Sequence, residues 1–192
     1  MKIITRMEDW DERIKHFPED TEETLGIGIH PETSVSFGSE NDVNLEYIKE
    51  HNIPIFDQNR RGGTIVHSKG SITIGFIYTV GNYGYKPLRK MFNAFYRYLL
   101  LHGISASIEK NDLLIEGYKV ASCVSKLDGE NYNLGYEGIQ FSTTLDLDLI
   151  KKICLKPMEK VPRALSDYGF DTERIMDWIK RYLKANLNIE FE

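Results

Sequence analysis

Short β-rich segments alternate with helical segments along the whole of this 192-residue chain. The expected strands share β-branched or alternating apolar residues and are bounded by Gly, Asn or Asp turns. They cover 24–30, 33–38, 53–57, 64–79, 105–110, 112–126 and 138–145. Because amphipathic helices are expected between them, we predict an α+β (mixed α/β) fold in which a mixed β-sheet is flanked by helices.

Four segments place apolar residues at helical spacing: 40–52, 88–103, 145–155 and 173–186. We expect Asn41 or Asp42 to cap the first of them. The second ends at Gly103, and glycine commonly stops a helix. Its apolar stripe is expected to pack into the core and consists of Leu88, Met91, Phe92, Phe95 and Leu99. The last helix is expected to turn Ile175, Met176, Ile179 and Leu183 inward.

Length, charge and residue content limit the number of domains and the kinds of partner. A chain of 192 residues suits one domain better than two. A net charge of −5 disfavours broad nucleic-acid binding. No apolar run approaches the ~20 residues that cross a bilayer, so we expect a cytoplasmic protein with no membrane partner. Two cysteines, Cys123 and Cys154, and five scattered histidines predict neither a disulfide framework nor a structural metal.

A glycine corner with two arginines precedes the strand at 64–79. Gly62 and Gly63 allow the backbone to approach a ligand with its N–H groups exposed. Arg60 and Arg61 are suited to bidentate binding of a carboxylate or phosphate. The corner therefore suits an anionic small molecule, although an ordinary turn explains it as well. His67 on the following strand either faces the same site or is a structural histidine.

Two further residues are candidates for chemistry. Lys119 lies inside an otherwise apolar strand, so its ammonium group either reaches the sheet edge or faces a negative partner. Cys154 is flanked by Lys151, Lys152 and Lys156, which would favour a thiolate. The alternative for Cys154 is a small apolar residue buried under a helix.

Taken in order, these motifs resemble those of the lipoate-protein ligases and lipoyl (octanoyl) transferases, which are relatives of the biotin-protein ligases. The corner reads Arg60-Arg61-Gly62-Gly63 and is followed by His67-Ser68-Lys69-Gly70. An amphipathic helix then leads to Asn-Asp at 111–112 and to the strand segment GYKVAS at 117–122. The segment YEGIQFSTTLDLDLIKKICLKP at 136–157 is similar to the family's next strand and short helix, although Glu137 stands where a histidine is usual. The resemblance covers residues 24–165.

The resemblance implies the class II synthetase-like architecture of biotin and lipoate ligases. Residues 1–192 would form a single catalytic domain, without the C-terminal accessory domain of larger ligases. The implied activity is attachment of a lipoyl or octanoyl group to a specific lysine of a lipoyl domain or another carrier protein.

Roles for individual residues follow from the same resemblance. Lys119 would hold the substrate carboxylate or acyl carbonyl. The corner arginines and glycines, with His67 and Gly70, would bind the substrate. Asn111 and Asp112 would lie near a nucleotide and its magnesium.

Two mechanisms remain open at this point. A ligase would use ATP and Mg²⁺ to activate free lipoate as an acyl-adenylate. A transferase would need neither cofactor, because it takes octanoyl from acyl carrier protein as a thioester on Cys154. The short chain favours the transferase, whereas the local sequences DVNLEYIKEHNIP and LKPMEK favour the ligase, toward which we lean. A non-catalytic module that binds a lipoyl-type ligand or a carrier domain is the third possibility, and biotin transfer is less favoured.

Overall fold

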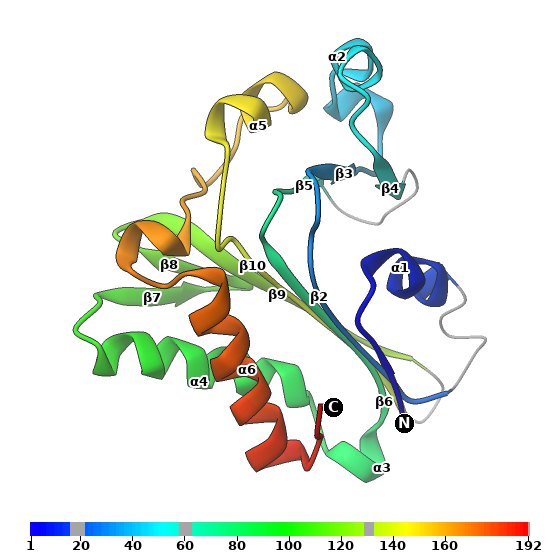
Figure 1. Cartoon of the computed structure of the whole chain (residues 1–192), viewed down its shortest axis with the longest axis vertical. Coiled ribbons are helices and arrows are strands. Elements are labelled where there is room, and N and C mark those ends of the chain that lie inside the picture. The colour runs from blue at the N-terminus through cyan, green and yellow to red at the C-terminus, as the bar shows by residue number, and fades with distance from the viewer. Residues whose placement is uncertain (16–21, 58–62, 129–132, 192) are drawn as a thin grey trace.

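A large mixed sheet lies at the centre of the computed structural model, which describes residues 1–15, 22–57, 63–128 and 133–191 (Figure 1). Among these residues, seven strands pair in the order β1-β2-β6-β10-β9-β8-β7. β1 runs parallel to β2, and the other neighbouring strands are antiparallel. The strands are Lys2–Ile4 (β1), Thr24–Ile29 (β2), Ile72–Thr79 (β6), Ala106–Glu109 (β7), Asp112–Ile115 (β8), Tyr118–Asp128 (β9) and Leu134–Phe141 (β10).

One face of the sheet is covered by α4 (Pro87–Leu101) and α6 (Thr172–Leu187), near α3 (Val80–Tyr83) and the 3₁₀ turn η2 (Leu165–Tyr168) (Figure 1). The predicted stripe of α4 is fully buried there, and each such side chain contributes about 1.5–3 kcal/mol. Ile175, Ile179 and Leu183 of α6 are buried in the same cluster, with Met176 partly buried against it. Gly103 has a φ of +76° just after α4 and confirms the expected helix stop.

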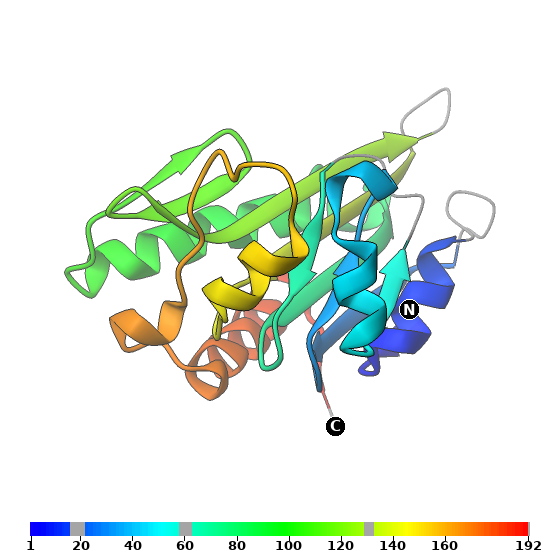
Figure 2. The same ribbon diagram turned by 90° about the horizontal axis from the view of Figure 1, so that it is seen from above.

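The other face carries a second, three-stranded sheet in the order β4-β3-β5 (Figure 1). Its strands are Ser34–Ser36 (β3), Ile55–Asp57 (β4) and Ile65–His67 (β5). α2 (Leu45–Glu50) and α5 (Leu147–Ile153) lie side by side on it (Figure 2), and the Asn44 N–H donates to the Ile153 carbonyl at 2.8 Å. The mixed sheet with helices on both faces confirms the predicted fold class.

α1 (Met7–Lys15) covers the large sheet on the side of the small sheet (Figure 1). Its Trp10 lies directly on Gly26 and Gly75, which are paired across β2 and β6. A Cβ atom on Gly75 would lie 1.8 Å from Cζ2 of Trp10. The helix can therefore reach the sheet only because these positions lack side chains.

The prediction of one helix over 40–52 is wrong in its first half. It is divided into a 3₁₀ turn, η1 (Glu40–Asp42), and α2, and Asn44 rather than Asn41 or Asp42 caps α2 by accepting from the Tyr47 N–H at 3.0 Å. Val43 between them is extended, because it forms a β-bridge with Cys154. A tertiary contact thus overrides the local helical pattern.

Two kinds of feature are missing from the described part of the chain. None of its helices is both long enough and apolar enough to cross a membrane. No cluster of three or more His, Cys, Asp or Glu side chains that could hold a metal ion is found in these residues.

Candidate active site

Lys119 is placed near the start of β9 and forms an ion pair with Asp112 of β8, with 3.0 Å between Nζ and Oδ1. The lysine side chain is 37% exposed and the aspartate 22%. Of the two alternatives left open by the sequence, the negative partner is therefore the one that the structure shows. The pair sits beside a register shift between Leu113 and Leu114, after which Lys119 is paired with Leu114 of β8.

The backbone of Lys119 is held by the segment that follows α5. We call residues 155–164 the strap. The Lys119 N–H donates to the Val161 carbonyl at 3.0 Å, and the Arg163 N–H donates to the Lys119 carbonyl at 2.9 Å. Arg163 is itself fixed, because its guanidinium carbon lies 3.6 Å from the ring centroid of Tyr118. The strap thus pairs with β9 at the residue expected to act on the substrate.

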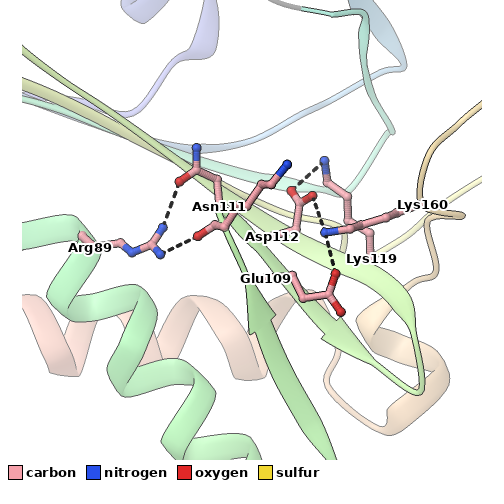
Figure 3. Close-up of polar contacts among 7 residues, drawn as sticks. Arg89, Glu109, Asn111, Asp112, Lys119 and Lys160 are labelled. Carbon is pink, nitrogen blue, oxygen red and sulfur yellow. Dashed lines mark hydrogen bonds and ion pairs between the residues drawn. The ribbon is translucent and has the colours of Figure 1, made fainter.

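Asp112 is oriented by the turn that precedes it (Figure 3). Arg89 of α4 donates through Nη1 to Oδ1 of Asn111 at 3.3 Å and through Nη2 to the Lys110 carbonyl at 2.6 Å. The Asn111 carbonyl accepts from the Cys123 N–H at 2.8 Å. The predicted Asn-Asp motif is therefore anchored to α4 and β9, with the Asp112 side chain on Lys119.

A cavity of about 140 Å³ opens between β5, α5, the strap and strands β9 and β10. Its polar wall includes Lys119, Ser122, Gln140 and Lys160. Its apolar wall includes Ile65, Val66, Leu145, Ile150 and Met158. A lysine in a partly apolar lining suits a small ligand that has an acidic head and apolar atoms.

The glycine corner is described only in part. Arg60, Arg61 and Gly62 lie outside the described residues. At Gly63, no described heavy atom lies within 4 Å of the position of an added Cβ. Thr64, which follows directly, lines the same cavity as Lys119. The residue that follows the corner and the distant lysine therefore line one cavity.

His67 and Gly70 are placed differently. The His67 ring stacks on the His30 ring with 4.6 Å between centroids, and its Nε2 lies 3.3 Å from Oγ of Ser36. His67 is not among the described residues that line the cavity. Gly70 has a φ of +86° in the turn between β5 and β6, and its carbonyl accepts from Oγ1 of Thr172 at 3.0 Å. These contacts join segments of the fold rather than facing the cavity.

Cys154 ends α5, is partly buried and lines the cavity with Lys119. Burial raises the pKa of its thiol. The neighbouring lysines have other partners: Nζ of Lys156 lies 2.5 Å from Oδ1 of Asp42, Nζ of Lys151 lies 3.9 Å from Oδ1 of Asp148, and Nζ of Lys152 lies over the Tyr47 ring. The structure favours the neutral thiol over the thiolate that the flanking lysines suggested.

Two features were missed by the sequence analysis. Lys160 of the strap lines the cavity and pairs with Asp112 and Glu109, but a lysine in a loop carries no local signal of this role. Glu137 is completely buried, and its carboxylate accepts from the backbone N–H groups of Leu88 at 2.7 Å and Arg89 at 3.1 Å, so it caps α4. Burial raises the pKa of Glu137 to about 7. Its place before Gly138, where a histidine is usual in the family that the sequence resembles, was the available signal.

The fold and the site define a class of protein. A large mixed sheet flanked by helices on both faces is the fold of the catalytic domains of lipoate and biotin ligases. The family profile of the lipoyl protein ligase A/B catalytic domain matches residues 9–191, so the chain belongs to that family. This confirms the resemblance found in the sequence, and family and fold together support an enzyme of lipoyl attachment.

Solved structures show the same fold. A lipoate-protein ligase A bound with ATP superposes with a TM-score of 0.74 at 17% identity, over 100% of this chain and 87% of that one. A bi-partite lipoate ligase from Thermoplasma acidophilum, studied with its E2 lipoyl domain, gives 0.73 at 17% identity, over 100% and 85%. A biotin protein ligase mutant from Aquifex aeolicus with biotin is more distant, at 0.50 and 13% identity over 98% and 68%. A search of curated protein sequences finds no match.

Proposed function

We propose that this chain is a lipoate-protein ligase that uses ATP to attach a lipoyl or octanoyl group to a lysine of a lipoyl carrier domain. The observation that carries the proposal is the position of Lys119, which lines a cavity with an apolar wall. An acyl tail would lie against Ile65, Val66 and Met158, and the carboxylate would meet Lys119. This arrangement matches both ends of a fatty-acid-like substrate.

Two steps would follow in this site. The substrate carboxylate attacks the α-phosphorus of ATP, so that an acyl–phosphate bond forms and pyrophosphate leaves. The carrier lysine then attacks the acyl carbonyl, an amide forms and AMP leaves. In both steps oxygen atoms of the substrate carry negative charge, and a fixed ammonium group stabilises charge that develops there. Lys119 would supply that charge, and Asp112 would keep its ammonium in place.

Asn111 and Asp112 are the residues that would lie beside the nucleotide. Mg²⁺ is usually held by one or two carboxylates together with substrate phosphates, and so does not need a cluster of protein ligands. Both oxygens of Asp112 already pair with lysines, Oδ1 with Lys119 and Oδ2 with Lys160, and Glu109 also pairs with Lys160. These carboxylates therefore do not offer this donor set.

The proposed partner is a lipoyl domain. The Thermoplasma acidophilum ligase of the same fold was studied with its E2 lipoyl domain. The cavity of this chain opens beside the strap, and the carrier lysine would enter there.

A transferase is the second candidate, because Cys154 lines the same cavity as Lys119. An octanoyl thioester on its sulfur would place the acyl carbonyl near that ammonium group. The raised pKa of the thiol weighs against it.

Intact-mass measurement of a lipoyl domain separates these functions. The chain is incubated with the domain and either lipoate plus ATP or octanoyl-acyl carrier protein. A lipoyl increment that needs ATP and survives Cys154→Ser supports the ligase. An octanoyl increment that needs only the thioester donor and is lost in Cys154→Ser supports the transferase. If neither appears while lipoate still binds, the chain is a binding module.

A further inference from the structure

Lys160 makes the Lys119–Asp112 pair part of a larger charge network (Figure 3). Its Nζ lies 3.2 Å from Oε2 of Glu109 and 3.3 Å from Oδ2 of Asp112. Its side chain is 22% exposed, as is that of Asp112, so both charges are partly removed from water. Asp112 thus gives one oxygen to each lysine.

The network contains two ammonium groups and two carboxylates, and its charges balance. Asp112 is the shared member, since Oδ1 contacts Lys119 and Oδ2 contacts Lys160. Within the network, Glu109 is paired with Lys160 only. A change at Glu109 or Lys160 therefore alters how strongly Asp112 neutralises Lys119 without touching Lys119 itself.

The backbone strengthens this coupling. Lys160 directly precedes Val161, whose carbonyl accepts from the Lys119 N–H at 3.0 Å. Burial lowers the pKa of Lys160, but its hydrogen bonds to Glu109 and Asp112 outweigh this and raise it overall, so the residue carries its charge near neutral pH. A charged side chain on the strap thus faces the carboxylate that controls the cavity lysine.

We propose that Lys160 is a positioning residue that draws Asp112 partly away from Lys119, and so leaves the Lys119 ammonium free to hold an anionic substrate head. Glu109 sets the strength of this effect by competing for Lys160. The inference rests on the proposed function only in taking the anion to be the carboxylate of a lipoate-type acid. The network itself is a property of the folded chain.

Kinetics of carrier modification test the proposal. In Lys160→Gln, Asp112 is left to Lys119 alone, so the KM for lipoate should rise about tenfold, the scale of one charged hydrogen bond, with a smaller change in kcat. Lys160→Arg keeps the charge and should restore KM. Glu109→Gln frees Lys160 to draw harder on Asp112 and should lower KM. The matched control, Lys184→Gln, removes an exposed lysine paired with Glu190 at 2.8 Å near the C-terminal end of α6.

A purely structural role for Lys160 predicts that Lys160→Gln and Glu109→Gln act in the same direction, because each breaks the same ion pair. Opposite shifts in KM support the proposal. Equal shifts, or no shift beyond that of Lys184→Gln, overturn it.

A second measurement needs no lipoate. Trace acetylation with acetic anhydride followed by peptide mass spectrometry reports how readily the Lys119 amine reacts. Labelling of Lys119 should be slower in Lys160→Gln and faster in Glu109→Gln than in the wild type. If labelling shifts in this way but lipoate does not bind, the proposed function fails while the network stands. If lipoate binds and is transferred but labelling is unchanged, the positioning role fails.

Discussion

Replacement of Glu137 by Gln tests the account of the α4 cap. The carboxylate is buried, and burial raises its pKa from 4.5 to about 7, against the favourable effects of the N–H groups of Leu88 and Arg89 and of the charges on Lys86 and Arg89. The folded chain therefore binds a proton more tightly than the unfolded chain. Its stability should fall as the pH rises between these two values, by about 3 kcal/mol at 1.36 kcal/mol per pKa unit.

Glutamine does not titrate, so Glu137→Gln removes this dependence. It also leaves one of the two α4 N–H groups without an acceptor, which costs about 1–3 kcal/mol at every pH. The wild type should therefore be clearly more stable than the variant at pH 5. At pH 8 this advantage should shrink or reverse.

Urea denaturation followed by circular dichroism at pH 5 and pH 8 measures both proteins. Their difference is the informative quantity, because other groups titrate in both: burial lowers the pKa of His30 to about 4, which makes stability rise with pH. Glu190→Gln, at an exposed carboxylate, is the matched control. A difference in unfolding free energy between wild type and Glu137→Gln that is the same at both pH values would refute the reasoning.

Three further predictions concern the site and its support. Lys119→Ala should lower kcat/KM for carrier modification by about 10²–10³-fold with an unchanged circular dichroism spectrum, since a preorganised charge is lost; retained turnover would remove Lys119 from the active site. Gly75→Ala should displace Trp10, because the new Cβ would lie 1.8 Å from the indole. The unfolding free energy should fall by about 1–3 kcal/mol and the tryptophan fluorescence should shift, whereas an unchanged melting temperature would contradict this. The wild type should lose stability as the pH falls from 6.5 to about 4, because the His30 imidazole takes up a proton on unfolding in this range. His30→Gln should weaken this loss, and identical pH profiles of the melting temperature in the two proteins would count against the prediction.

Much of the fold was predictable because its signals are local. The stripe of α4 packs into the core as its spacing indicates, and the strand at 24–30 appears within a few residues of its expected bounds. The strand expected at 64–79 is divided by the turn at Gly70 into β5 and β6, which belong to different sheets. The helix at 40–52 failed because Val43 pairs with Cys154, more than a hundred residues away in the chain. Contacts of that range leave no trace in the local pattern.

The site residues likewise differ in whether local sequence could reveal them. Lys119 was visible because a lysine is unusual in an apolar strand, and the resemblance to a family added Asp112. Lys160 could not be found, because its role depends on the strap crossing back to β8 and β7. For Cys154 the sequence left a thiolate and a buried apolar residue open, and burial, which raises the pKa of the thiol, favours the second.

The pairing of the strap with β9 ties the length of the strap to the position of Lys119. The Val161 carbonyl accepts from the N–H of Lys119 and the Arg163 N–H donates to the carbonyl of the same residue, so an inserted residue between Val161 and Arg163 would break one of the two bonds. A residue inserted near Pro157, before this anchor, would bulge outward and leave the anchor in register. Natural or engineered variants of this chain should accordingly accept extra residues early in the strap and reject them at its end.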